Sequence, residues 1–349
     1  MSNYDQFAAA VKEISGGKNI VLLDDLGLPS VYVPINKLKN SEIISGGSEN
    51  THPAFSVNGV EKSRFLYSKY QNIVINGRAY SLSHRDPKTY VNFDQARQAC
   101  EAKGAGFHLG TLAEWAAAAL LTRKMGTMPH GNNNYGGDSA YTYEKGQESA
   151  KDNNKTGRTF TGSGPATWGH DHTQFGIQDM NGNVWEWLGG MRLNEGEIQI
   201  IPYNNAALGS ECDMSASSTL WKAIKNDGSL VAPGTAATLK YDFVSNNIQL
   251  TTGITSAQDA GRGGSYTAMT LASGVTAPEL AKALILYPDE PGKDYGGDYH
   301  WMNNAGERLP FAGGDWDNGA SAGVFNLDLG SARSGSYGNV GFRSAYVEL

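Results

Sequence analysis

The sequence has few cysteines: only Cys100 and Cys212 occur in 349 residues. Two thiols provide neither a disulfide framework nor a cysteine metal cluster. Cys100 falls in a stretch with helical periodicity, where we expect it to behave as a small apolar core residue. A disulfide-stabilised scaffold and a cysteine metal centre are therefore excluded.

Long apolar runs and excess positive charge are also missing. No run reaches the roughly 18 residues of a membrane-spanning helix. The polar, acidic N-terminus lacks the basic segment and apolar run of a signal peptide, so we expect a protein made in the cytoplasm. The formal net charge of −7 argues against nucleic acid or a membrane surface as a general partner.

What is present indicates a packed protein with many turns. Apolar residues make up 40% of the chain and charged residues 18%, which supports a core. The 44 glycines follow no collagen-like period and indicate irregular loops. Two helices are predicted. The first begins after Asn92 and ends before Gly104, and the second begins at Thr111, where Glu114 completes a capping box, and ends at Gly126.

Residues 1–80 are predicted to form a small β-rich region. A short helix over residues 4–14 would place Phe7, Val11 and Ile14 on one side. Strand-like runs follow at residues 19–23, 30–34, 63–70 and 72–81. Attachment or oligomerisation is one role for this region, and forming the first layer of the following domain is the other. The sequence leaves both open.

The C-terminal stretch, residues 313–343, alternates apolar residues with a restricted polar set. Between Asp315 and Asn339 there is no Lys, Glu, Gln, His or Thr, although a solvated surface normally mixes in Lys and Glu. Asn, Asp, Ser, Gly and Tyr are instead typical of adaptable binding loops. The stretch is a candidate binding surface, and the other interpretation is an ordinary loop rich in Gly, Ser and Asn.

A second motif, from Phe175 to Trp187, reads FGIQDMNGNVWEW. Related pieces lie at residues 109–115, 312–316 and 341–343. Together these pieces resemble the formylglycine-generating enzyme branch of the C-type lectin fold. The resemblance implies an α+β fold with two helices, short irregular β-sheets and many loops, preceded by the β-rich N-terminal region.

The resemblance also suggests how the chain is divided. It covers residues 90–345, so we assign residues 81–349 to the C-type lectin-fold domain. A long insertion interrupts the family pattern at about 191–310, and residues 261–266 within it echo the glycine motif of residues 312–316. We place the family's strand at residues 313–316, because the Gly-Phe-Arg motif follows it within a short distance.

The C-terminal stretch further resembles the variable region of a diversity-generating retroelement variable protein. In that family, template adenines are mutated, and Asn codons diversify into Asp, Ser, Gly and Tyr. The resemblance implies a fixed scaffold that includes Trp316, Phe325, Leu327 and Phe342. The expected ligand-binding, variable residues are Asp315, Asp317, Asn318, Ser321, Asn326, Asp328, Gly330, Ser331, Gly335, Tyr337, Gly338 and Asn339.

This resemblance implies a hypervariable protein that binds a protein or surface receptor. Phage or prophage host-receptor binding is the favoured setting, because a component of a phage tail needs no signal peptide. Bacterial surface display is the other setting. The sequence names neither the ligand nor the oligomeric state.

The resemblance to the formylglycine-generating enzyme implies a calcium site, although the binding role requires no cofactor. The side chain of Asp179, the main-chain carbonyls of Gly182 and Val184, and Glu186 would form an oxygen cage. Hard oxygen ligands from a tight glycine turn suit Ca²⁺. Hydrogen bonds of Asp179 and Glu186 within the turn are the other interpretation.

Two alternative functions have less support. A formylglycine-type oxidoreductase with altered chemistry would need a thiol or metal centre. No cysteine follows Cys212, and copper(I) selects soft thiolate ligands. His170 and His172 have metal-like spacing but are typical of a polar loop. A calcium-dependent lectin would carry a Glu-Pro-Asn or Gln-Pro-Asp sugar motif, which is missing. We therefore expect a binding protein and not an enzyme.

Overall fold

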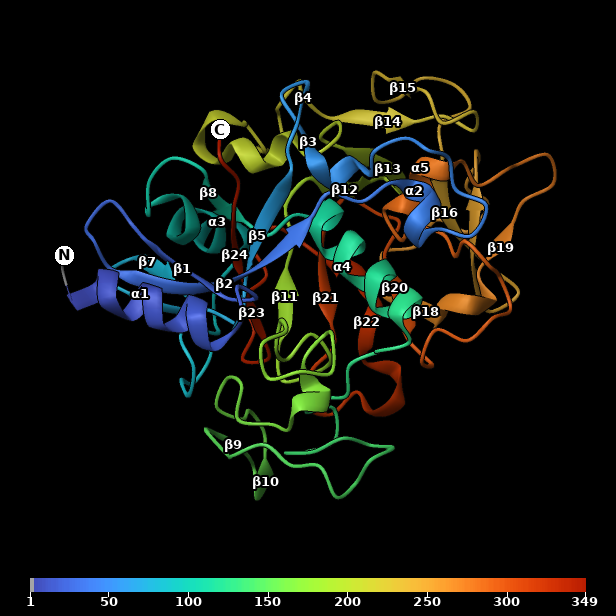
Figure 1. The fold of residues 1–349 in the computed structure, drawn as a ribbon. Coiled ribbons are helices and arrows are strands. Elements are labelled where there is room, and N and C mark those ends of the chain that lie inside the picture. Colours follow the sequence, from blue (N-terminus) through green and yellow to red (C-terminus); the bar gives the residue numbers. More distant parts are fainter. Residues whose placement is uncertain (1–2) are drawn as a thin grey trace.

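The computed structural model describes residues 3–349, and helix α4 (Leu112–Met125) lies at its centre. The Thr111 hydroxyl accepts a hydrogen bond from the Glu114 amide, and the Glu114 carboxylate accepts one from the Thr111 amide. Gly126 ends the helix with φ 71°, a conformation that glycine adopts without steric cost. Both predicted ends are confirmed. Figure 1 shows α4 across the upper part of the central strands β21 and β22.

Helix α3 (Phe93–Glu101) is the first of the two predicted helices. The Asn92 side chain accepts a hydrogen bond from the Gln95 amide at 2.9 Å, as expected for an N-cap. Its buried residues include Phe93 and Cys100, so the cysteine is a core residue as predicted.

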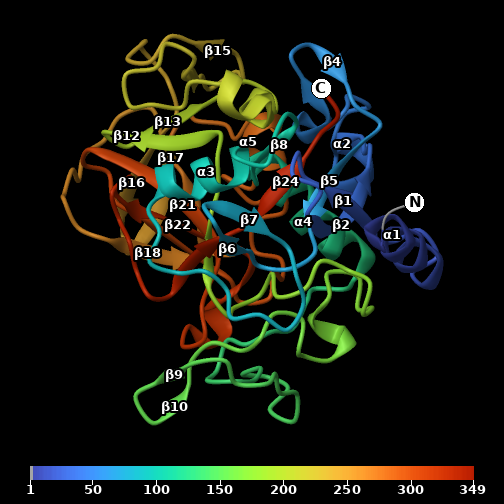
Figure 2. The same ribbon diagram turned by 90° about the vertical axis from the view of Figure 1, so that its left-hand side faces the viewer.

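The smaller sheet joins the two ends of the chain in the order β1-β2-β5-β24-β8. Its strands are β1 (Ile20–Leu23), β2 (Pro29–Asn36), β5 (Arg64–Ser68), β8 (Phe107–Leu109) and β24 (Ser344–Tyr346). Strand β24 pairs with β5 on one side and β8 on the other. Figure 2 shows this shared layer. The N-terminal strands are therefore part of a sheet that the C-terminus completes.

Helix α1 (Asn3–Ile14) lies outside this sheet and has no buried residue. The predicted helix is present, but Phe7 and Ile14 on its apolar side are exposed. Hairpins decorate the fold: β3 (Ser56–Val57) with β4 (Val60–Glu61), β6 (Ile73–Ile75) with β7 (Arg78–Tyr80), and β9 (Lys151–Asp152) with β10 (Lys155–Thr156).

The larger sheet follows the order β18-β20-β22-β21-β12-β13-β16-β17-β19, with β11, β23, β14 and β15 paired off this path. Its central strands are β11 (Trp185–Trp187), β21 (Glu307–Gly313), β22 (Gly323–Ser331) and β23 (Val340–Phe342). The others are β12 (Met191–Asn194), β13 (Glu197–Ile200), β14 (Lys222–Ile224), β15 (Leu230–Val231), β16 (Lys240–Val244), β17 (Asn247–Thr251), β18 (Arg262–Ser265), β19 (Thr270–Leu271) and β20 (Tyr299–Met302). Strands from the predicted insertion thus extend the sheet beyond β21 and β22.

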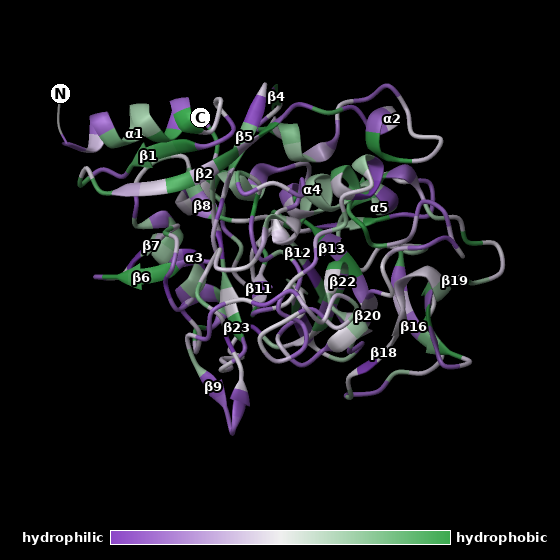
Figure 3. Cartoon of the chain, turned by 60° about the horizontal axis from the view of Figure 1, so that its bottom comes forward, coloured by the Kyte–Doolittle hydropathy of each residue, from purple (hydrophilic) through white to green (hydrophobic). Residues whose placement is uncertain are grey.

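The two sheets and α4 share a hydrophobic core, and the short helices α2 (Asn40–Ile43) and α5 (Glu279–Ala283) pack beside it. Trp115 and the alanines of α4 from 116 to 119 are fully buried. Figure 3 shows the green, hydrophobic residues of α4 and β5 and the purple, hydrophilic β9. Within residues 3–349, no helix combines the length and apolar character needed to cross a membrane.

Candidate ligand-binding face

The candidate face begins at two glycines, Gly313 at the end of β21 and Gly314 directly after it. Gly313 and Gly314 have φ of 97° and 80°, values that side chains rarely adopt. A Cβ on Gly313 would lie 3.2 Å from the Trp115 ring and 3.0 Å from the Met180 carbonyl oxygen. The Trp115 indole nitrogen also donates to the Val324 carbonyl at 2.7 Å. The glycines therefore let the chain turn closely over a core tryptophan.

Strand β22 separates scaffold residues from predicted variable residues. Its core side chains are at most 1% exposed and are Phe325, Leu327 and Leu329. Successive residues alternate across a strand, so Asn326, Asp328 and Gly330 lie on the opposite side, as does the fully buried Val324. Within β22, the scaffold residues Phe325 and Leu327 thus lie on one side, and the half-buried Asp328 and Gly330 lie on the other.

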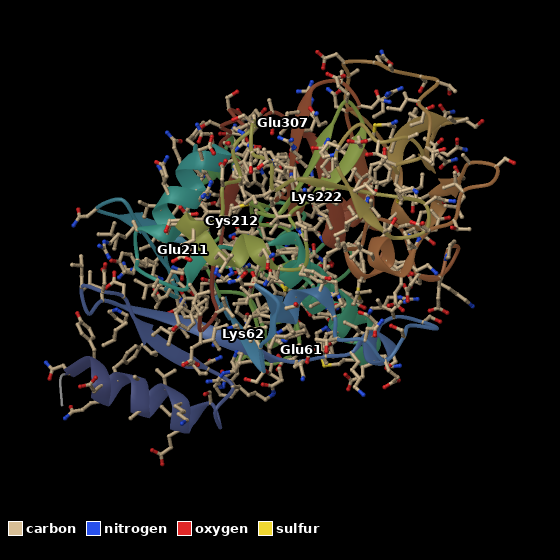
Figure 4. The ribbon with its side chains drawn as sticks, turned by 90° about the horizontal axis from the view of Figure 1, so that it is seen from above. Glu61, Lys62, Glu211, Cys212, Lys222 and Glu307 are labelled. Atoms are coloured by element: carbon tan, nitrogen blue, oxygen red, sulfur yellow. The ribbon has the colours of Figure 1, made fainter. Side chains whose placement is uncertain are left out.

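Two arginines fix the main chain of the loop after β22. Arg333 donates to Asp94 at 2.9 Å and to Glu307 at 3.0 Å. Arg158 donates to the Gly338 carbonyl at 3.2 Å. Figure 4 shows Glu307, which accepts from Arg333, in the upper part of the view, whereas Glu61 and Lys62 lie in the lower part. A loop held in this way loses little further conformational freedom when it binds a ligand.

Two exposed tyrosines meet here through the main chain: Tyr337 in this loop and Tyr90 in the segment between β7 and α3. Their exposed fractions are 43% and 68%. The Tyr90 amide donates to the Tyr337 carbonyl at 2.9 Å, and a Cβ on Gly338 would lie 2.8 Å from the Tyr90 hydroxyl. Sequence reasoning missed Tyr90, which lies far from the polar stretch and has no motif that distinguishes it.

A hydrogen bond joins the two ends of the polar stretch. The Asn339 side-chain amide donates to the Asp315 carboxylate, which also accepts from the Asp317 amide at 3.2 Å. Asp315 is only 2% exposed. Burial, helped by the neighbouring Asp317 carboxyl, raises the pKa of Asp315 to about 7. The carboxyl that joins the two ends of the stretch therefore has a pKa near neutral pH.

The twelve predicted variable residues divide by burial. Asp317 and Tyr337 are exposed, and the half-buried ones are Asn318, Ser321, Asp328, Gly330, Ser331, Gly335, Gly338 and Asn339. Asp315 and Asn326 do not lie on an exposed face as expected, because both are buried. The Asn326 amide donates to the Ser321 carbonyl at 2.6 Å, so it supports the short helix η5 (Gly319–Ser321) from beneath.

Strand β20 extends the face beside β22. Trp301 lies opposite Asp328 in the parallel pairing, is 38% exposed, and has its ring 5.2 Å from that of Tyr299. Burial raises the pKa of Asp328 to about 6. Trp301 therefore borders the face, whereas His300 is fully buried.

A pocket of about 370 Å³ borders η5. Its walls bring the loop around residues 128–141 against residues 320–324. The His130 ring stacks on the Tyr141 ring at a centroid distance of 3.7 Å, and the buried Asp298 lines the same space. Figure 1 shows that the lower ends of the central strands point toward the β9–β10 hairpin. The pocket adds concave surface next to the polar stretch.

The predicted calcium ligands lie together in the turn before β11, but the Gln71 side chain stands among them. Its amide nitrogen is 3.4 Å from the Gly182 carbonyl, 3.0 Å from the Val184 carbonyl and 3.1 Å from the Glu186 carboxylate. The Asp179 carboxylate instead accepts from the main-chain amide of residue 162 at 2.8 Å. The Gln71 amide nitrogen thus occupies the point toward which these oxygens are directed, while the other Asp179 carboxylate oxygen is buried without a hydrogen-bond partner.

The other candidate ligands are also engaged in the fold. His170 accepts a hydrogen bond from the Ile177 amide at 2.9 Å, and burial lowers its pKa to about 4. A ring nitrogen of His172 is 3.0 Å from the Met128 carbonyl. Across the described part of the chain, no group of three or more His, Cys, Asp or Glu could hold a metal ion. Burial also raises the pKa of the Cys212 thiol to about 11.

These features define a C-type lectin fold of the formylglycine-generating enzyme kind, with few helices and many short strands. The chain belongs to the family of sulfatase-modifying factor enzyme 1-like domains, whose match covers residues 35–269. The predicted fold is thus confirmed. The match includes both predicted helices and the echo at residues 261–266, and it ends before the polar stretch.

Three solved structures match over most of the chain at low sequence identity. Treponema denticola variable protein 1 has 13% identity and a TM-score of 0.35, covering 94% of this chain and 98% of its own. The Major Tropism Determinant U1 variant has 11% identity and a TM-score of 0.32, covering 90% and 62%. The P3c variant has 10% identity and a TM-score of 0.32, covering 94% and 71%. No curated protein matches the sequence.

Proposed function

We propose that the chain is a ligand-binding protein whose polar C-terminal stretch contacts the ligand, and that it binds host receptors for a phage or prophage. The observation that carries the proposal is the separation of roles between residues 315 and 339. Scaffold side chains such as Phe325 and Leu327 lie in the core, whereas ten of the twelve predicted variable residues are exposed or half-buried. A rigid scaffold with changeable contacts limits the ordering cost of binding.

We propose a binding role without catalysis, although the matching family is named for an enzyme. Thiolate, and not thiol, is the reactive form of cysteine. Cys100 and Cys212 are both buried, and burial raises the pKa of both thiols. Neither lies within the polar stretch, so the exposed surface of that stretch carries no thiol chemistry.

The experiment that tests the proposal is sequencing of the encoding locus. We expect a near-copy of the segment encoding residues 313–343, next to a reverse transcriptase gene. The copy should differ from the gene only where the copy has adenine. The changed codons should fall on the exposed and half-buried residues, with the codons for Phe325 and Leu327 unchanged.

The segment encoding residues 191–310 is the internal control, because the proposal predicts no copy of it. If no copy of residues 313–343 exists, or if its differences fall equally on scaffold codons, diversification is ruled out. The polar stretch would then be an ordinary loop surface, and the assignment of the face would have to be abandoned.

A further inference from the structure

The turn between Asp179 and Glu186 directs a ring of oxygen atoms at a single nitrogen. The carbonyl oxygens of Asp179, Gly182 and Val184 and one carboxylate oxygen of Glu186 all lie 3.0–3.4 Å from the Gln71 side-chain nitrogen. Gln71 is fully buried. The distances are within the range of N–H···O contacts, and the amide nitrogen carries two hydrogens, so the four oxygens share two donors.

The orientation of the Gln71 amide is set by a chain of hydrogen bonds that starts at the main chain. The Thr159 main-chain amide, which can only donate, contacts the Asn183 side-chain oxygen at 2.8 Å. The Asn183 nitrogen therefore faces the Gln71 oxygen, at 2.7 Å. The Gln71 nitrogen must then face the oxygen ring, because an amide presents its donor and acceptor on opposite sides.

The charge of Glu186 in this ring is already balanced by the protein. Arg343 donates to the second Glu186 carboxylate oxygen at 2.7 Å, and both side chains are at most 1% exposed. The remaining guanidinium nitrogens donate to carbonyls of residues 68, 69 and 178. Glu186 is therefore paired without a metal ion. The neighbouring Asp179 carboxyl accepts from the main-chain amide of residue 162, its other oxygen is buried without a partner, and burial raises its pKa to about 6.

The same turn supports the candidate face. Strand β11 pairs in parallel with β23, and the Trp185 amide donates to the Asn339 carbonyl at 2.9 Å. Asn339 in turn bonds Asp315. The contacts that stabilise the turn therefore also position Asn339, at one end of the polar stretch.

We infer that the Gln71 amide takes the place of a divalent cation in this turn, so that the fold and its candidate face are independent of calcium. This inference concerns the scaffold and does not depend on the proposed function. It also separates this chain from a calcium-dependent lectin, whose binding would be lost on chelation.

The test compares thermal unfolding of the wild-type chain and of Gln71→Glu, each with excess Ca²⁺ and with EDTA. The wild-type Tm should be the same in both. Gln71→Glu keeps the shape but replaces the donor by a carboxylate oxygen, which adds a buried negative charge to the ring that a bound cation would offset. Its Tm should fall by about 5–10 °C in EDTA and recover in Ca²⁺.

Gln249→Glu on β17 is the matched control, because it adds the same charge to a half-buried strand position away from the turn. It should show no response to Ca²⁺. A folded Gln71→Glu chain that ignores Ca²⁺, or one that responds no more than Gln249→Glu, would overturn the inference.

A second measurement decides the matter if Gln71→Glu does not fold. Terbium is added to the wild-type chain, and its emission is recorded with excitation of tryptophan, since Trp185 lies in the turn. We expect neither sensitised emission nor a Tm shift on adding Ca²⁺. Sensitised terbium emission that Ca²⁺ competes away, or a wild-type Tm raised by Ca²⁺, would show that the ring accepts a cation and refute the inference.

Discussion

At the scale of single residues, Asp315 has the most unusual environment in the polar stretch. It is a buried carboxyl next to a second carboxyl, and its pKa is raised from 3.8 to about 7. Folding therefore favours the protonated form. The contribution of this group to stability is complete below about pH 4 and is lost as the pH rises toward 7.

Replacement of Asp315 by Asn should remove this pH dependence while keeping an acceptor for the Asn339 amide. Relative to Asp315→Asn, we expect the wild-type chain to lose on the order of 1–3 kcal/mol of unfolding free energy between about pH 5 and pH 8. Urea unfolding at a series of pH values measures this. Asp317→Asn is the control, since it keeps the buried carboxyl and should show a smaller dependence. Parallel pH profiles for wild type and Asp315→Asn would contradict the assignment.

In this stretch, the sequence indicated the polar candidate residues better than it indicated which of them are buried. The composition between Asp315 and Asn339 identified the polar set and the alternating scaffold. It did not show that Asp315 and Asn326 are buried, because their burial depends on η5 and on a hydrogen bond that closes the stretch. It also could not find Tyr90, which meets Tyr337 only after folding.

At the scale of elements, strand β22 and the loop after it differ in the substitutions that the fold tolerates. Its core side carries Phe325, whose ring lies 5.0 Å from the Tyr295 ring and 5.5 Å from the Tyr266 ring. The loop after the strand carries Tyr337, whose ring is largely free of the core. One element thus joins a part that must be kept to a part that can vary.

Phe325→Ala should lower the unfolding free energy by about 3–5 kcal/mol, because it leaves a cavity among buried aromatic rings. Tyr337→Ala, the matched surface truncation, should change it by less than about 0.5 kcal/mol. Chemical denaturation of both variants measures the difference. Equal losses would mean that the loop is part of the core and unsuited to diversification.

At the scale of the whole molecule, the two chain ends contribute unequally. Helix α1 has no buried residue, whereas β24 lies inside the smaller sheet between β5 and β8. The Ser344 hydroxyl is 3.0 Å from the Tyr32 hydroxyl and 2.9 Å from that of Ser68. The C-terminus therefore closes a layer that the N-terminal region begins.

Deletion of the first 14 residues should shift Tm by less than about 2 °C, because little apolar surface is lost. Deletion of residues 344–349 should leave the chain unfolded, because β5 and β8 lose their common neighbour. Circular dichroism melts of both truncations test this, with removal of only residues 348 and 349 as the control. A stable protein without β24 would show that the N-terminal region folds as a separate unit.

The sequence by itself determined the local features of this protein. Capping residues set the ends of α3 and α4, and alternation set the two sides of β22, because both depend on neighbours in the chain. Tertiary structure alone decided how distant segments fill one another's space. Gln71 enters a turn more than 100 residues away along the chain, and this contact decides whether the turn holds an amide or an ion. Burial and electrostatic environment come from such contacts, which no local pattern records.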